Sequence, residues 1–90
     1  MSGEQALILA TFGSRDEAER AGEKMVEQQL ATDGAVIPTV HTFHFREGRM
    51  HRNHEALLLL KTTGGQAGEV RDQLLAESPD CDPMRLTLGP

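Results

Sequence analysis

Histidine is the residue type whose placement in this chain most directly suggests chemistry, because all four copies fall within one short stretch. They are His41, His44, His51 and His54. If Glu47 and Gly48 are the central residues of a tight turn, this stretch forms a hairpin in which paired positions sum to 95. His44 then lies opposite His51. His41 lies opposite His54 in the same way, and directly paired side chains have β-carbons about 4.5–5.5 Å apart.

Each histidine pair presents two imidazoles, which suit a borderline metal ion such as Zn, Cu or Ni. Because side chains alternate along a strand, the two pairs lie on opposite faces of the hairpin. The hairpin therefore offers two two-ligand sites rather than one four-ligand site, and a third ligand has to come from Glu55 or from another subunit. Two other interpretations remain open. The histidines are ordinary solvated residues, or they form a pH-sensitive contact in which paired imidazolium ions repel each other.

The same stretch is basic, which suggests a second kind of ligand. Residues 41–54 contain Arg46, Arg49 and Arg52 against the single acid Glu47, a charge of +2 that leaves −7 on the rest of a chain whose total is −5. These arginines are candidates for binding a small anion. The alternative is that they protect an exposed strand edge against aggregation.

Three further features allow more than one interpretation. Phe43 and Phe45 share the face of His41, which favours burial between subunits over a platform for a ligand. Residues 62–65 precede a predicted helix but lack the lysine of a phosphate loop, so an ordinary loop is favoured over an anion site. Cys81 lies between two aspartates and is interpreted either as a soft metal ligand or as an incidental thiol. No nucleophile motif accompanies the histidines, so we do not expect an enzyme.

The elements that must position these residues follow from the apolar periodicity. The predicted elements are a strand at 6–11, a helix at 14–30, hairpin strands at 35–46 and 49–61, a loop at 62–65, a helix at 66–77 and a strand at 84–88. The first strand is apolar throughout, as in a central strand buried on both faces. Ser14 and Glu17 fit a capping box at the first helix, and Pro38 requires a sheet edge or a bulge. The order predicts an α+β, ferredoxin-like βαββαβ sandwich, in which a four-stranded antiparallel sheet carries two helices on one face.

Composition limits the class of protein. Ninety residues, 38% of them apolar and 3% aromatic, predict a single domain over residues 1–90 that favours self-association. The negative charge excludes a nucleic-acid binder that depends on overall positive charge. No run approaches the ~20 apolar residues of a membrane helix, so we expect no membrane partner. One cysteine excludes an internal disulfide and the first residues lack a positive leader, which together predict a cytoplasmic protein.

Several segments also occur in a distinctive order and spacing. They are residues 7–11 (Leu-Ile-Leu-Ala-Thr), residues 24–31 (Lys-Met-Val-Glu-Gln-Gln-Leu-Ala), Ile37-Pro38, Gly48 and residues 55–62 (Glu-Ala-Leu-Leu-Leu-Leu-Lys-Thr). Together they resemble the CutA divalent-cation tolerance family. The resemblance implies a ferredoxin-like protomer in a tight homotrimer, with a non-enzymatic metal-binding or tolerance role. Among the positions linked with metal in that family, only the acidic position Glu55 has a match here. Typical members continue beyond the point where Pro90 ends this chain, so the resemblance implies a shortened and divergent member.

We therefore predict a non-enzymatic, homotrimeric CutA-like protein that binds a divalent metal ion, Cu or Zn, through the hairpin histidines and Glu55. The main alternative is a trimeric signal protein in which Arg46, Arg49 and Arg52 hold a small anionic effector between subunits. A structural trimer without a ligand is a third interpretation. An enzyme that uses paired histidines as acid and base is a fourth.

Overall fold

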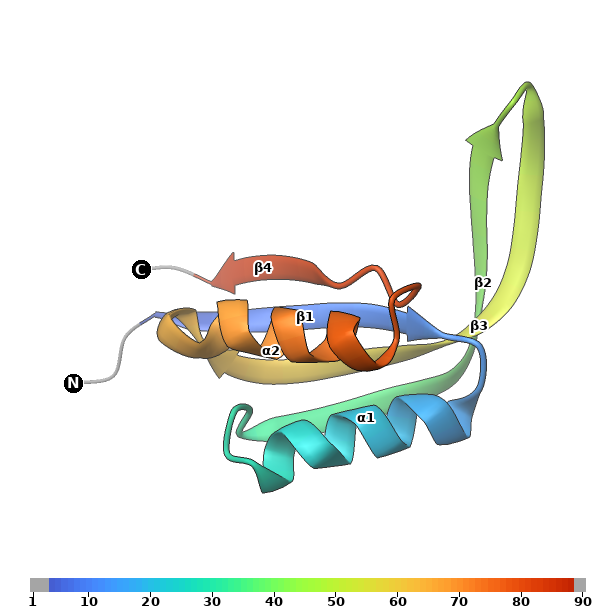
Figure 1. Cartoon of the computed structure of the whole chain (residues 1–90). Helices are drawn as coiled ribbons and strands as arrows, with labels where there is room; N and C mark the ends of the chain where they lie inside the picture. The colour runs from blue at the N-terminus through green and yellow to red at the C-terminus, as the bar shows by residue number, and fades with distance from the viewer. Residues whose placement is uncertain (1–3, 89–90) are drawn as a thin grey trace.

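The computed structural model describes residues 4–88, which form six elements in the order β-α-β-β-α-β (Figure 1). They are β1 (Gln5–Phe12), α1 (Arg15–Glu27), β2 (Asp33–Arg46), β3 (Arg49–Thr63), α2 (Gly64–Glu77) and β4 (Met84–Leu88). The predicted order is confirmed. Two predicted details are wrong: α1 ends at Glu27 rather than at residue 30, and no loop occupies residues 62–65, because β3 runs directly into α2.

Each difference has an identifiable cause. Gln29 adopts a left-handed conformation with φ of 62°, which ends the helix, and the amide of Leu30 then donates to the carbonyl of Met25. At the other position, Thr62 pairs with Ala6 of β1, and its buried hydroxyl donates to the carbonyl of Leu30 at 2.6 Å. These bonds hold residue 62 in the sheet rather than in a loop.

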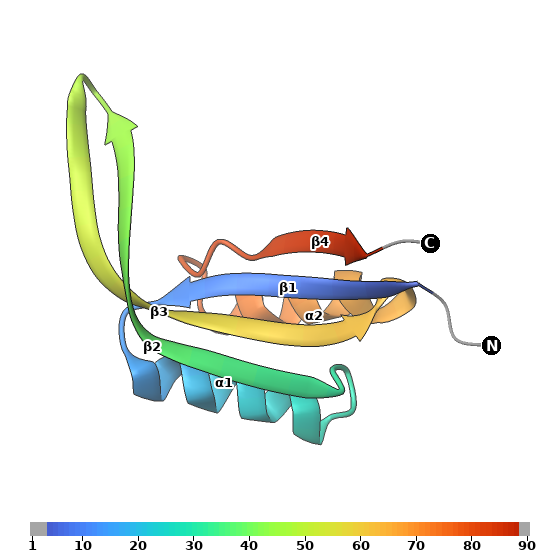
Figure 2. The ribbon, with the colours of Figure 1, turned by 180° about the vertical axis from the view of Figure 1, so that it is seen from behind.

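The four strands form one antiparallel sheet in the order β2-β3-β1-β4. Both helices pack on the same face of this sheet, while the view from behind shows the other face uncovered (Figures 1 and 2). The predicted ferredoxin-like sandwich is thus confirmed. Along β1, Ala6 and Ile8 are buried, whereas Leu7 and Leu9 are only half-buried. In the single chain the predicted burial of this strand on both faces is complete on the helix side alone, since within residues 4–88 the helices cover only that side.

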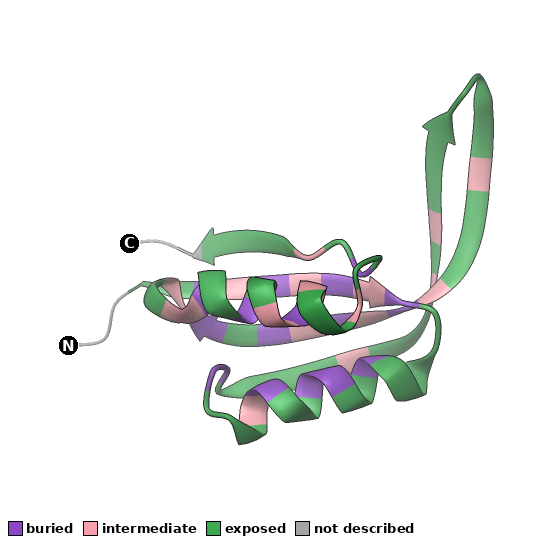
Figure 3. Ribbon diagram, in the orientation of Figure 1, coloured by how far each residue is buried: buried purple, intermediate pink, exposed green. Residues whose placement is uncertain are grey.

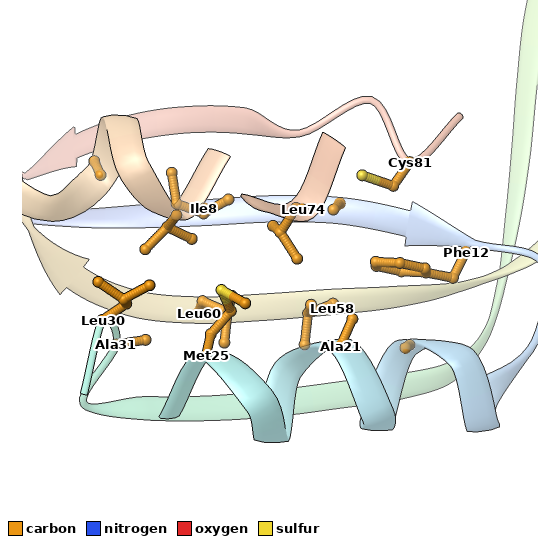
Figure 4. Packing of buried hydrophobic residues seen from close by; sticks show 14 of the residues in the cluster. Ile8, Phe12, Ala21, Met25, Leu30, Ala31, Leu58, Leu60, Leu74 and Cys81 are labelled. Carbon is orange, nitrogen blue, oxygen red and sulfur yellow. The ribbon is translucent and has the colours of Figure 1, made fainter. Parts of the chain in front are cut away.

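The hydrophobic core lies between the sheet and the two helices (Figure 4). Its largest fully buried side chains are Ile8, Met25, Leu58, Leu60, Val70, Leu74 and Cys81. Helix α1 approaches the sheet closely at Gly22, where a β-carbon would lie 2.6 Å from Cδ1 of Leu58. The predicted cap is also present, because the amide of Glu17 donates to the Ser14 hydroxyl at 3.2 Å. Across residues 4–88, neither helix is long and apolar enough to cross a bilayer.

Beyond the sheet, β2 and β3 continue as a two-stranded hairpin that stands away from the body of the molecule (Figures 1 and 2). The register shifts between Ile37 and Val40, which places Pro38 at an irregularity of an edge strand, as predicted. At the tip, Glu47 with φ of 54° and Gly48 with φ of 75° are both left-handed, as a type I′ turn requires. Most of the hairpin is exposed (Figure 3), and the molecule extends over 48 × 27 × 21 Å.

Candidate functional site

The hairpin register brings the four histidines together in the predicted pairs. In the ladder between β2 and β3, His41 pairs with His54 and His44 pairs with His51. Residues 47–48 are the two residues left between the strands, so the assumed turn is confirmed. A two-residue turn sets the register from the tip, and both histidine pairings follow from it.

Side-chain alternation divides the hairpin into two faces. The aromatic hairpin face carries His41, Phe43, Phe45, Met50, Arg52 and His54. The basic hairpin face carries Thr42, His44, Arg46, Arg49, His51, Asn53 and Glu55. Farther along β3, the aromatic hairpin face continues into the buried Ala56 on the helix side of the sheet, whereas the basic hairpin face continues into the half-buried Leu57 on the open side. The two histidine pairs therefore lie on different faces, as predicted.

The two pairs also differ in ring geometry. The rings of His41 and His54 have centroids 4.4 Å apart and are tilted by 54°. The rings of His44 and His51 have centroids 5.2 Å apart and are nearly parallel, at 8°. A metal ion bound by an imidazole lies near the ring plane, about 2.0–2.1 Å from the nitrogen. Tilted planes intersect and can share one ion, whereas nearly parallel stacked planes share an ion only after one ring rotates.

Glu55 lies apart from both pairs. It shares the basic hairpin face with His51 but is four residues away along β3, about 13 Å at the usual rise of a strand. The hydroxyl of Thr42 donates a hydrogen bond to its carboxylate. His54 is its neighbour in sequence but lies on the opposite face. Across residues 4–88, no group of three or more His, Cys, Asp or Glu side chains is placed to hold a metal ion. A metal at either pair must therefore take its other ligands from water or from a second copy.

The structure separates the three candidate anion ligands. Arg46 and Arg49 face each other on the basic hairpin face, one step nearer the tip than His44 and His51, while Arg52 lies on the aromatic hairpin face. None of the three arginines forms an ion pair with another residue of the 4–88 range. On the basic hairpin face, Nε2 of His51 is buried and has no hydrogen-bond partner among the described residues.

Cys81 and residues 62–65, the two remaining candidates from the sequence, lie outside the hairpin. Cys81 is a free, buried thiol in the core of the body. Burial raises the pKa of the Cys81 thiol above its usual value, and the nearby carboxylates of Asp82 and Asp80 act in the same direction, while a backbone hydrogen bond opposes them. A raised pKa keeps the thiol protonated, whereas the thiolate is the form that binds metal. The ordinary loop predicted at residues 62–65 is replaced by the end of β3 and the start of α2.

An acidic hollow between α1 and β2 was not predicted. Carboxylates line it, and its apolar lining includes Val26, Val36 and Leu58; the acids are Glu19, Glu23 and Glu27 of α1 and Asp33 of β2. The signal was present in the sequence, because glutamates at four-residue spacing lie on one side of a helix. The basic residues of the hairpin and these acids thus occupy different parts of the molecule.

Comparisons with known proteins agree with one another. Residues 6–87 match the family described as CutA1 divalent ion tolerance protein. The chain is 32% identical over 69 residues to the divalent-cation tolerance protein CutA of Archaeoglobus fulgidus, which covers 77% of this chain and 67% of the relative. The solved structure of the periplasmic divalent cation tolerance protein CutA from that organism has a TM-score of 0.82 at 26% identity, over 96% of this chain and 83% of the other. The structure of CutA from Synechococcus elongatus PCC7942 has a TM-score of 0.83 at 25% identity, over 99% of this chain and 79% of the other.

Proposed function

The chain belongs to the CutA1 divalent ion tolerance family, and from this premise we propose that it is a non-enzymatic protein that binds a divalent metal ion at the His41–His54 pair. The observation that carries the proposal is the tilted arrangement of these two rings, whose centroids lie 4.4 Å apart. Imidazole suits Zn and Cu, and a given nitrogen site binds Cu²⁺ more tightly than Zn²⁺. Both histidines are exposed, so an ion reaches them from solvent.

Electrostatics favour the same pair over His44–His51. Two guanidinium groups, those of Arg46 and Arg49, lie one step from the His44–His51 pair on its own face. Only one, that of Arg52, lies one step from the His41–His54 pair. Each guanidinium repels a divalent cation, and the repulsion is strongest at short range.

Ring orientation favours it as well. For His44 and His51 to share an ion, one ring must rotate out of the stack, because the two ring planes are nearly parallel. The rings of His41 and His54 lie on the exposed aromatic hairpin face and are already inclined to each other by 54°. The ion would complete its coordination with water or with groups of a second copy.

Calorimetric titration of Zn²⁺ and Cu²⁺ into the full chain tests this site. We expect His41→Ala and His54→Ala each to weaken binding by about tenfold or more, since one of two protein ligands is lost. The matched control is His44→Ala, which removes an imidazole from the opposite face and should change the affinity by less than about twofold. Unchanged affinity in both His41→Ala and His54→Ala would contradict the proposal, and a loss confined to His44→Ala would assign the ion to the other pair.

We also propose that the chain forms a homotrimer through the open face of its sheet. This face carries an apolar surface composed of the half-buried Leu7, Leu9, Leu57 and Leu59 and the exposed Ile37, Met84 and Leu86. A continuous apolar patch of this kind is typical of a protein contact surface. Phe43 and Phe45, each 69% exposed, lie on the aromatic hairpin face rather than in line with the open face, so a second copy would cover them through a separate contact of the hairpin. Three copies is the number expected from the family resemblance of the sequence.

The mass of the particle in solution tests the assembly. Light scattering at micromolar concentration should give three times the mass of one chain. Leu86→Asp should lower that mass, because it places a charge in the apolar surface, whereas Thr87→Asp on the opposite side of β4 should leave it unchanged. A single-chain mass for the unmodified protein would contradict the proposal.

A further inference from the structure

We propose that the basic hairpin face binds a small multivalent oxyanion of the phosphate class between Arg46 and Arg49, with His44 and His51 as a second level of donors. This site is separate from the proposed metal site, which lies on the aromatic hairpin face. It extends the function of the hairpin beyond cation binding. Its ligand would carry at least two phosphate groups.

The backbone places the four donors on one face of the hairpin. Arg46 pairs with Arg49, and His44 pairs with His51 in the same antiparallel ladder. The two levels are two residues apart along each strand, about 7 Å at the usual rise. A two-residue left-handed turn closes the ladder directly beyond the arginines, so their separation is set by the turn rather than by a flexible loop.

The charge on this surface lacks a counter-charge within the described chain. Like charges directly opposite each other in a ladder destabilise a sheet. Neither Arg46 nor Arg49 forms an ion pair with another residue between positions 4 and 88. A bound anion would remove the repulsion, so the free hairpin is arranged for a ligand of opposite sign.

The buried nitrogen of His51 is an independent indication of a ligand. Its Nε2 is shielded from solvent and has no hydrogen-bond partner among residues 4–88. A buried polar atom without a hydrogen-bond partner is unfavourable, because it has lost its bonds to water without replacement. The His51 side chain as a whole is only half-buried, so rotation of its ring would turn Nε2, in the tautomer that carries hydrogen there, toward an anion oxygen on the basic hairpin face.

The chemistry of the donors selects phosphate oxygens. A guanidinium presents its N–H groups in a planar fork that matches phosphate geometry and bonds two oxygens at once. A single phosphate would engage the arginine level alone. A diphosphate reaches toward the histidine level as well, because the levels are about 7 Å apart. The distribution of charge agrees, since residues 41–54 carry +2 while the rest of the chain carries −7 and would repel such a ligand.

Titration of pyrophosphate into the full chain, without added metal and at constant ionic strength, tests the site. We expect Arg46→Ala and Arg49→Ala each to weaken binding by about tenfold, because each removes a bidentate charged donor. Arg52→Ala is the matched control, since it removes the same charge from the same hairpin on the other face, and should change the affinity by less than about threefold. Inorganic phosphate should bind more weakly than pyrophosphate.

Three results would overturn the proposal. The first is equal weakening by Arg52→Ala and Arg49→Ala, which would indicate attraction by net charge alone. The second is equal affinity for phosphate and pyrophosphate. The third is a heat of binding no larger than that of sodium chloride. The substituted arginines are exposed, and circular dichroism verifies that each variant keeps its fold. His41→Ala should leave pyrophosphate affinity unchanged, so failure of the metal site and failure of the anion site are separate outcomes.

Discussion

The same two strands, β2 and β3, pass through two contrasting environments. In the body, alternate residues of β3 such as Leu58 and Leu60 are buried against the helices. In the hairpin, residues 41–54 include no buried residue. Stability therefore resides in the body, where apolar surface is removed from water. Ligand chemistry resides in the hairpin, where charged and imidazole groups stay within reach of solvent. If this division is correct, substitutions in the two regions change different measurable properties.

The largest expected effect is a loss of stability from truncating the core. Leu60 is fully buried in β3, and Leu60→Ala removes its packing and leaves a cavity. We expect the free energy of unfolding to fall by about 2–5 kcal/mol, measured by guanidinium denaturation. Metal affinity of the folded fraction should stay within about twofold of the original, because the hairpin histidines do not contact Leu60.

Phe45→Ala is the corresponding truncation in the hairpin. Phe45 is 69% exposed in the single chain, so its removal should cost less than about 0.5 kcal/mol in a dissociated protomer. Any further loss should grow with protein concentration, since a second copy would supply the missing contacts. A loss as large as that of Leu60→Ala at every concentration would break the comparison between body and hairpin.

The body could be predicted from the sequence because burial leaves a periodic signal. Apolar residues at helical or alternating spacing identified six elements in their correct order, and the capping pair at Ser14 and Glu17 marked the start of α1. The errors arose where tertiary contacts decide the local structure. Thr62 is polar and follows a lysine, so only its pairing with β1 and its bond to Leu30 reveal that it belongs to the sheet.

The hairpin could be predicted in register but not in detail. One assumption, a turn at residues 47–48, was enough to pair the histidines and to place the two pairs on opposite faces, whereas the three arginines were grouped as one site that the ladder divides between the faces. Ring orientation depends on side-chain torsions that spacing does not encode, so the difference between tilted and stacked pairs required the structure. The separation of Glu55 from the histidines follows from strand rise alone and was available beforehand.

A smaller effect should follow from straining the turn, and it should link the two ligand sites. Gly48 has φ of 75°, a conformation that costs a residue with a β-carbon about 1 kcal/mol or more. Gly48→Ala should therefore loosen the register on which both proposed sites depend. We expect metal and pyrophosphate affinities to fall together, by about threefold each, while the guanidinium midpoint of the body changes little.

Glu47→Asp is the matched control for the turn. Asp-Gly is a preferred pair for a type I′ turn, and the substitution keeps the charge of Glu47. Both affinities should be retained or slightly increased. Loss of one affinity without the other in Gly48→Ala would show that the two sites do not share the turn as their common support.

The smallest expected effect concerns the ionisation of Cys81, which tests whether titration in the body alters stability rather than binding. Burial raises the pKa of this thiol in the folded chain, so the folded state favours the neutral form. Stability from this source is complete below the unfolded thiol pKa of about 8.5, and it is lost as pH rises through the folded value, because the unfolded chain ionises first. Guanidinium unfolding between pH 7 and pH 10 should therefore show a steeper decline for the original chain than for Cys81→Ala. Parallel declines would mean that the thiol ionises equally easily in both states.

Pyrophosphate affinity measured over the same pH range should not distinguish the two proteins, since Cys81 lies in the core and contributes nothing to the basic hairpin face.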